Sequence, residues 1–346
     1  MTAKHKRKPL KSVLTREFII LGVIVFIFAR VLIQTPVGGG LTVITFLLFA
    51  LFTAPFIFMG NPVFVKRWQK SQDRINIRIM AAAAWLILVL YGLLTGQISA
   101  LQSLLFFLYT AIPLVLLVIR PKDKQSLLWH DLLILAILWI SLEFGRIGTV
   151  NLPPVHAFVS LSMLYGLLLL LYIYLIRLDF PLGYEYRLET KEWTTALLNF
   201  MILFVLLAVI GGQIGFISIA KRLPGFHELL VRLVSIGFFI AIPQEILFRG
   251  VLYTLIEKKL QNRRYNVLWA LVISSVIYGL AHINDVYTPV AQVSLGSVGF
   301  PVPWAMMLFA TLSGLFYAWV YIRTRKITAA ALTHFLINAS WFLFFS

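Results

Sequence analysis

The sequence predicts an all-α membrane protein, a multi-pass bundle of transmembrane helices. Of its 346 residues, 60% are hydrophobic and only 12% carry a charge. The hydrophobic residues fall in repeated runs of about 18–20, the length that a helix needs to cross a bilayer. The basic residues give a formal charge of +17 and lie between these runs. Basic charge confined to short connections is typical of membrane proteins and argues against a partner nucleic acid.

The first hydrophobic run extends from Phe18 to Ile33 and follows a strongly basic segment. A cleaved signal peptide is one interpretation of this pattern. Arg30 interrupts the run, however, and no clear small-residue cleavage site follows, which favours an uncleaved first span. The chain contains no cysteine, which excludes disulfides, thiolate metal ligands and a cysteine nucleophile together.

The hydropathy pattern predicts eleven spans, each followed by a short connection. We expect them near residues 17–34, 41–59, 79–95, 101–119, 129–146, 157–176, 195–212, 229–256, 266–282, 304–322 and 328–344. Every second connection holds a basic cluster, whereas the opposite connections together hold only Lys221 and Arg222. Because Lys and Arg concentrate on the cytoplasmic side, we expect a cytoplasmic N-terminus. The lipid bilayer is then the first partner, and the plasma membrane the expected location.

The connection 177–194 divides the chain into six N-terminal and five C-terminal spans. We predict an accessory bundle at 1–180 and a functional domain at 195–340. The N-terminal half holds one polar pair within a span, Glu143 and Arg146, three residues apart on one helix face. We interpret this pair as a local ion pair at the end of its span.

The eighth span contains the most polar stretch at membrane depth. Pro243, Gln244, Glu245 and Arg249 lie within two helical turns of otherwise apolar sequence. An ionisable residue inside the membrane is costly and points to a functional site. Glu245 and Arg249 are four residues apart, so a self-neutralising buried ion pair is the alternative. Pro243 favours the functional site, because it loosens the helix where the polar residues begin.

Two other C-terminal spans contribute further polar residues. His282 ends the ninth span, and His334 and Asn338 lie four residues apart on one face of the last span. A lone intramembrane histidine is often a packing residue. Three spans that supply Glu, His, and His with Asn are more informative, since these groups can accept a proton, bind a divalent metal or stabilise an oxyanion.

Several known catalytic motifs do not fit this sequence. His227-Glu228 begins like a zincin motif, but Val231 stands where the second histidine would be. Ser313-Gly314 lacks the glycine of a rhomboid-like serine motif, because Thr311 occupies that place. The Gly-x-Gly-Asp motif of aspartyl intramembrane proteases is also missing from the chain.

Three motifs in order resemble those of the CAAX protease and bacteriocin-processing (CPBP or Abi) family, which includes the type II CAAX prenyl endopeptidases. The family pattern is Glu-Glu-x-x-x-Arg, Phe-x-x-x-His and His-x-x-x-Asn/Asp. The corresponding residues are Gln244-Glu245-x-x-x-Arg249, Tyr278-x-x-x-His282 and His334-x-x-x-Asn338. The resemblance covers about 195–340 and leaves the first six spans outside it.

The resemblance implies an intramembrane endopeptidase that acts on a membrane-associated peptide or protein. In that mechanism a Glu and the first His, here His282, activate a water molecule. His334 and Asn338 would stabilise the oxyanion, and Arg249 would be structural. Family members are often described as metalloproteases. Glu245, His282 and His334 could hold zinc, but the same groups can activate water without a metal, and both alternatives stay open.

Two residues depart from the family pattern. Tyr278 replaces Phe and keeps the ring. Gln244 replaces the first Glu, and a carboxamide cannot accept a proton at neutral pH. Three alternatives follow: Glu245 takes over, Gln244 only orients water, or the chain no longer cleaves peptides. Neighbouring helical residues point about 100° apart, so Glu245 would face elsewhere unless Pro243 re-aims it.

These observations leave three functional hypotheses. The first is an intramembrane endopeptidase, which requires His282 and His334 to lie close together. The second is a non-catalytic relative, an immunity or scaffold protein, for which Gln244 is the argument. The third is a transporter, which we rank last because only the eighth span has a proline-interrupted polar centre, whereas transporters usually carry such breaks in both halves.

Overall fold

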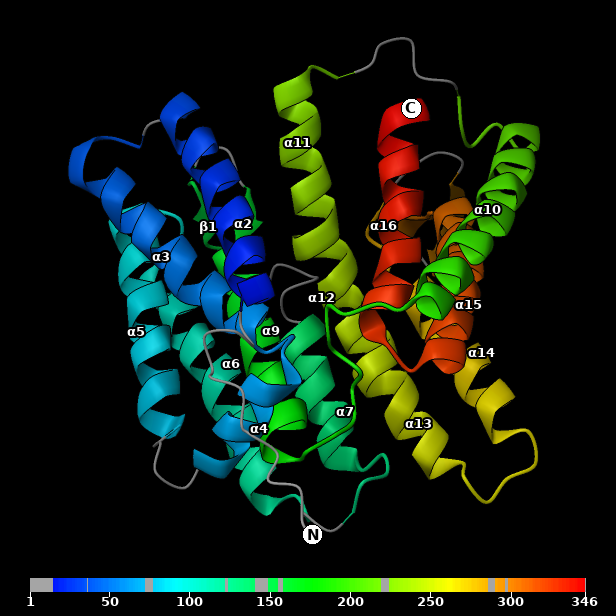
Figure 1. Cartoon of the computed structure of the whole chain (residues 1–346), viewed down its shortest axis with the longest axis horizontal. Coiled ribbons are helices and arrows are strands. Elements are labelled where there is room, and N and C mark those ends of the chain that lie inside the picture. Colours follow the sequence, from blue (N-terminus) through cyan, green and yellow to red (C-terminus); the bar gives the residue numbers. More distant parts are fainter. Residues whose placement is uncertain are drawn as a thin grey trace, which may run out of the picture.

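The structure is a computed structural model, and it describes residues 15–35, 37–71, 77–121, 124–140, 149–154, 158–218, 224–285, 290–295 and 298–345. Within these residues it is a bundle of helices with two short hairpins, so the predicted all-α fold is confirmed. Figure 1 shows the helices of the N-terminal half on the left and those of the C-terminal half on the right. The pair Glu143 and Arg146 lies outside the described residues.

The N-terminal half consists of antiparallel helices and one small hairpin. Its helices are α2 (Thr15–Gln34), α3 (Gly39–Phe58), α4 (Pro62–Ser71), α5 (Ile77–Leu94), α6 (Ala100–Ile119), α7 (Trp129–Leu135) and α9 (Leu161–Leu171). Wider π-helical turns, η1 (Ala136–Ile140) and η2 (Tyr172–Arg177), extend α7 and α9. Strands β1 (Asn151–Leu152) and β2 (Val159–Ser160) pair antiparallel. Ser160 caps the N-terminus of α9, and its hydroxyl oxygen accepts a hydrogen bond from the Met163 backbone N–H.

The C-terminal half is built around one long helical run at 226–259. This run consists of α11 (Phe226–Val234), η3 (Ser235–Ala241), α12 (Ile242–Glu245), η4 (Ile246–Tyr253) and α13 (Thr254–Lys259). The remaining elements are α10 (Thr190–Gln213), α14 (Asn266–Leu280), β3 (Ala291–Leu295), β4 (Val298–Val302), α15 (Trp304–Thr324) and α16 (Ile327–Phe344). Helix α15 packs between α14 and α16, all three contact the long run, and α10 covers α15 and α16.

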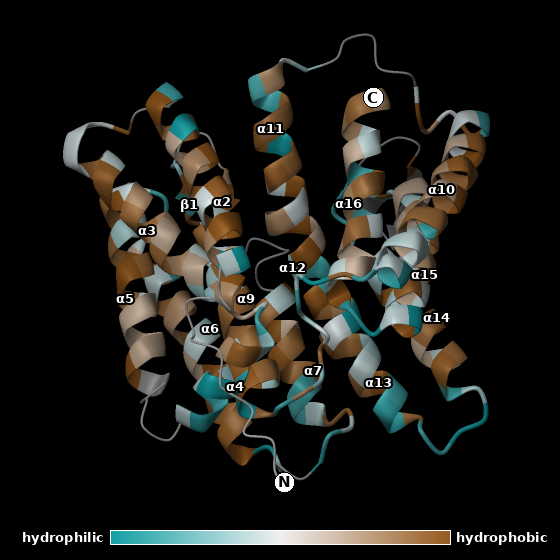
Figure 2. Ribbon diagram, viewed as in Figure 1, coloured by the Kyte–Doolittle hydropathy of each residue, from teal (hydrophilic) through white to brown (hydrophobic). Residues whose placement is uncertain are grey.

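The outward faces of the bundle are apolar, as Figure 2 shows. Seven helices of the described chain are long and apolar enough to cross a membrane. Four shorter apolar helices lie at Ile79–Leu94, Trp129–Ile140, Leu161–Arg177 and Asn266–Leu280. Together these helices overlap the eleven predicted spans one for one. The seven long helices support an integral membrane protein, whereas the crossing of the four shorter ones and the cytoplasmic N-terminus stay predictions.

Aromatic contacts and loop hydrogen bonds join the two halves. Phe239 of the long run lies with its ring 5.9 Å from Phe49 of α3 and 5.5 Å from Phe158. Trp139 of η1 packs edge-on against Phe248, at 5.4 Å between ring centroids. The connection after η2 also contacts the C-terminal half, because the Thr328 hydroxyl donates to the Glu185 carbonyl. The N-terminal half therefore lies directly against the helix that carries the polar residues.

Candidate active site

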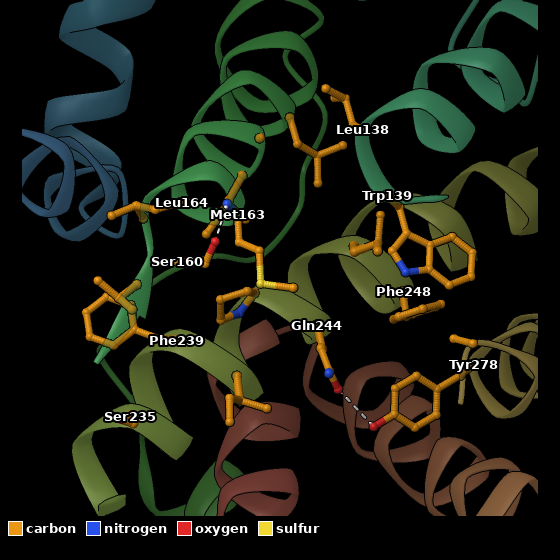
Figure 3. Close-up of a pocket in the computed structure, with 18 of the residues that line it drawn as sticks. Leu138, Trp139, Ser160, Met163, Leu164, Ser235, Phe239, Gln244, Phe248 and Tyr278 are labelled. Atoms are coloured by element: carbon orange, nitrogen blue, oxygen red, sulfur yellow. Dashed lines mark hydrogen bonds between the residues drawn. The ribbon is translucent and has the colours of Figure 1, made fainter. Parts of the chain in front are cut away.

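A cavity of about 450 Å³ lies between the long helical run and the N-terminal bundle. Its polar wall comes from the C-terminal half and contains Gln244, Tyr278, His282 and Asp285. Its opposite wall comes from the N-terminal half and is mostly apolar, with residues such as Trp139, Met163, Leu164 and Leu167. Figure 3 shows Met163 and Trp139 reaching toward the Gln244 side of this cavity.

The helix around Pro243 directs Gln244 and its neighbour to different surroundings. Proline has no N–H to donate, and the π-helical η3 ends directly before it, with the Ile242 N–H bonded to the Gly237 carbonyl. The chain then stays helical through the motif. Gln244 lines the cavity together with Pro243, whereas the Glu245 side chain is completely buried away from it. Pro243 therefore does not turn Glu245 toward the cavity.

Glu245 forms a buried cluster with Arg249 and His334. The Arg249 Nη1 donates to Glu245 Oε1 at 3.1 Å, and the Nη2 donates to the Gly314 carbonyl at 3.0 Å. The His334 Nδ1 lies 2.9 Å from the same Glu245 oxygen. An ionised carboxylate only accepts hydrogen bonds, so this contact places a proton on Nδ1. The carboxylate neutralises the guanidinium and fixes the second histidine, which is a structural arrangement.

Tyr278 joins the three motifs. Its hydroxyl donates to Gln244 Oε1 at 3.0 Å and lies 3.5 Å from His334 Nε2. Its ring lies 5.1 Å from the His282 ring and 6.1 Å from the His334 ring, measured between centroids. The Arg249 guanidinium lies over the same ring, 4.5 Å from its centroid. His282 and His334 thus both lie against the ring of Tyr278.

The hydrogen bond from Tyr278 fixes the orientation of the Gln244 carboxamide. Figure 3 shows the amide oxygen directed toward the tyrosine hydroxyl. Because the oxygen is occupied, the amide N–H₂ group remains available on a residue that lines the cavity. The two departures from the family pattern, Gln244 and Tyr278, are therefore bonded to each other.

His282 lies at the cavity wall just after the end of α14. Its Nδ1 lies 2.5 Å from Asp285 Oδ2, and its side chain is 16% exposed. A carboxylate on Nδ1 leaves Nε2 as the nitrogen that can accept a proton. Asp285 lies three residues after His282 and also lines the cavity.

Asn338 is not part of the cavity wall. It lies on α16 one turn beyond His334 and is half-buried. His334 itself is fully buried and stacks on Tyr317, with 4.7 Å between the ring centroids. The described side chains thus bring Gln244, Tyr278 and His282 to the cavity and keep Glu245 and His334 behind them.

A metal ion does not fit the described side chains in this arrangement. Zinc takes three or four protein ligands that converge on one point. Glu245 and His334 contact each other, whereas His282 contacts Asp285, so these residues form two separate pairs. Among the residues that the structure describes, no group of three His, Asp or Glu side chains could hold a metal.

The sequence interpretation missed two contributors to the site. Asp285 was not singled out, although its spacing of three residues from His282 was a signal that could have found it. The apolar wall, with Trp139 and Met163, carries no signal, because apolar residues fill every predicted span of this chain.

Residues 226–340 match the model of a family described as Type II CAAX prenyl endopeptidase Rce1-like. The match covers the long helical run, α14, α15 and most of α16, and therefore all three motifs. It leaves out the N-terminal bundle and α10. No curated protein and no solved structure matches the chain.

Proposed function

We propose that this integral membrane protein is an active intramembrane endopeptidase, because its residues 226–340 match the model of the Type II CAAX prenyl endopeptidase Rce1-like family. It hydrolyses a peptide bond in a membrane-associated peptide or protein. The observation that carries the proposal is the convergence of the three motifs on Tyr278 at the wall of one cavity. We further assign the protein to the plasma membrane, since its loop charges are those of a protein inserted from the cytoplasm.

In the proposed reaction His282 is the general base. Its Nε2 takes a proton from a water molecule, and the water oxygen attacks the carbonyl carbon of the scissile bond. The protonated His282 then gives the proton to the departing nitrogen as the C–N bond breaks. The products are a carboxyl group and an amine, and the histidine returns to its neutral form. Glu245 is not the base in this proposal, because it is buried and bonded to Arg249 and His334.

Gln244 would stabilise the oxyanion that forms on the carbonyl oxygen. Its amide N–H₂ group is free to donate, since the Tyr278 hydroxyl occupies the amide oxygen. Of the oxyanion donors that the resemblance implies, His334 supports the site from behind Tyr278 instead, and Asn338 lies outside the cavity wall. In this proposal the carboxamide at 244 does not mark a loss of activity.

The test is cleavage of a membrane-tethered peptide library by purified protein. Wild type should cleave, and His282→Ala should lower kcat by about 10²-fold or more, because general base catalysis is lost. Tyr278→Phe should lower kcat with little change in KM, since the ring stays but the amide loses its orientation. Removing an oxyanion donor costs about 10²–10³ in kcat, so Gln244→Glu should also lose activity.

The opposite outcome would identify a non-catalytic relative. If the wild-type protein cleaves no peptide and Gln244→Glu does, the chain has kept the cavity but has lost catalytic activity. Glu228→Gln is the matched control for the change between carboxyl and carboxamide, because Glu228 is exposed on α11 outside the cavity wall. This variant should cleave like wild type.

A further inference from the structure

The polar wall of the cavity contains one carboxylate. Among the described residues that line the cavity, Asp285 is the only Asp or Glu. Gln244 is a carboxamide, and Glu245 is buried behind the wall in contact with Arg249. If a carboxylate assists the chemistry within this cavity, Asp285 is the residue that can supply it.

Asp285 contacts His282, the general base of the proposed reaction. Its Oδ2 lies 2.5 Å from His282 Nδ1, and its backbone N–H bonds to the His282 carbonyl, so the turn after α14 fixes both residues. The Asp285 side chain is 40% exposed and that of His282 is 16% exposed. The histidine is therefore clamped between the Tyr278 ring on one side and a carboxylate on Nδ1.

Helix stability alone does not account for this pair. Helix α14 ends at Leu280, and a carboxylate near a helix C-terminus gains nothing from the helix dipole. Exposed ion pairs at such sites also contribute little, about 0–1 kcal/mol. What the contact does determine is the state of the imidazole. A carboxylate on Nδ1 selects the neutral tautomer that is protonated at Nδ1, so Nε2 is the acceptor, and its negative charge stabilises the imidazolium that forms when Nε2 takes a proton.

We propose that Asp285 is the positioning carboxylate of this active site and acts through His282. This proposal rests on the proposed endopeptidase function. Asp285 does not touch the substrate or accept a proton; it holds the His282 ring in one orientation and one tautomer. The water proton moves to His282 Nε2 and later to the departing amine, while Asp285 stays ionised throughout.

The kinetic test compares Asp285→Asn, Asp285→Glu and wild type on the same membrane-tethered peptides. Asn keeps the shape but replaces the carboxylate, so we expect kcat to fall about 10²-fold or more with KM nearly unchanged. Glu restores the carboxylate on a longer side chain and should recover a large part of kcat. Glu228→Gln, which makes the same chemical change outside the cavity wall, should leave both constants at their wild-type values.

A second readout follows the pair without cleavage. In protein labelled with ¹⁵N-histidine, the ring signals of His282 are those lost in His282→Ala. Wild type should show the tautomer protonated at Nδ1, and Asp285→Asn should shift these signals toward the other tautomer. A merely structural aspartate would lower the amount of folded protein without this selective change.

The possible outcomes distinguish the role proposed for Asp285 from the proposed endopeptidase function. If wild type cleaves and needs His282, but Asp285→Asn keeps its kcat and its histidine signals, the proposal for Asp285 is wrong and the endopeptidase function stands. If neither wild type nor Gln244→Glu cleaves any peptide, the proposed function fails and Asp285 has no reaction to assist. If only Gln244→Glu cleaves, Asp285 does not compensate for the carboxamide, and the proposal is also overturned.

Discussion

Gln244 and Glu245 are neighbours in the chain, yet their side chains have opposite surroundings. Successive residues of a helix point about 100° apart, so only one of the two can face the cavity. Gln244 does so, and Glu245 contacts Arg249 and His334 in the interior. A buried guanidinium needs a partner of opposite charge, because an unpaired buried charge is very costly. The Glu245 carboxylate therefore stabilises the packing of α16 against the long helical run through its contacts with Arg249 and His334.

This arrangement predicts strong coupling between Glu245 and Arg249. Glu245→Gln or Arg249→Met alone should each lower the free energy of unfolding by about 3–5 kcal/mol, because each leaves one buried charge unpaired. The double variant should lose clearly less than the sum of the two, since neither charge remains. SDS titration in mixed micelles measures all three values.

Arg325→Met is the matched control for this cycle. Arg325 pairs with Glu257 at the surface, and its side chain is 54% exposed, so this change should cost less than about 1 kcal/mol. Additive losses from Glu245→Gln and Arg249→Met would contradict a shared buried pair. Full loss of cleavage in a folded double variant would instead indicate that Glu245 is the general base.

At the scale of elements, the site depends on how closely α14 approaches α15. Gly279 lies between Tyr278 and His282 on α14, and a methyl group added to it would overlap the Thr311 side chain. The same methyl group would lie 2.7 Å from the Met307 carbonyl oxygen of α15, which cannot move aside easily. The two helices therefore touch at a residue that only glycine fits.

Gly279→Ala should consequently disturb the site without changing any polar residue. Overpacking of this kind costs about 1–3 kcal/mol and displaces backbone. We expect a lower melting temperature and reduced kcat, because Tyr278 and His282 move together with α14. Thermal unfolding and cleavage measured on the same preparation test this expectation.

Gly212→Ala provides the control within another membrane helix. Gly212 is exposed on α10, and nothing lies within 4 Å of an added methyl group. Alanine should therefore be neutral or slightly stabilising there, since it favours helix more than glycine does. A Gly279→Ala variant as stable and active as Gly212→Ala would show that the approach of the two helices does not matter.

The hydropathy pattern was sufficient to predict where the membrane helices lie, but it did not predict the arrangement of side chains in the site. The apolar runs predicted the eleven apolar helices, because membrane spans need a fixed length of apolar sequence, but not the short polar helix α4. The separation of Gln244 from Glu245 also followed from helix geometry. The π-helical segments η3 and η4 around Pro243 had no sequence signal, since the hydrogen-bond register of a helix is decided by its packing. Asp285 was missed because it lies in a connection, where charges are common.

At the scale of the whole molecule, the cavity exists because two unlike halves face each other. The C-terminal half supplies the polar wall, and the N-terminal bundle supplies apolar residues from η1 and α9. The family match covers only the first of these walls. A peptide in the cavity would therefore contact the polar wall on one side and apolar side chains on the other, and we expect the apolar wall to determine which peptide side chains fit.

Substitutions of Met163 in α9 test directly whether the N-terminal half forms part of the substrate site. It lines the cavity, is 51% exposed, and reaches toward Gln244 in Figure 3. Met163→Trp should narrow the cavity and exclude peptides with bulky residues beside the cleaved bond, whereas Met163→Ala should admit larger ones. A methylene in an apolar pocket changes specificity by about 10–200-fold. The ratio of kcat/KM for bulky peptides to kcat/KM for small peptides should therefore shift by at least tenfold.

Met201→Trp is the matched control, because Met201 is equally exposed on α10 but lies outside the cavity wall. Equal peptide preferences in Met163→Trp and Met201→Trp would mean that the N-terminal half does not form part of the substrate site.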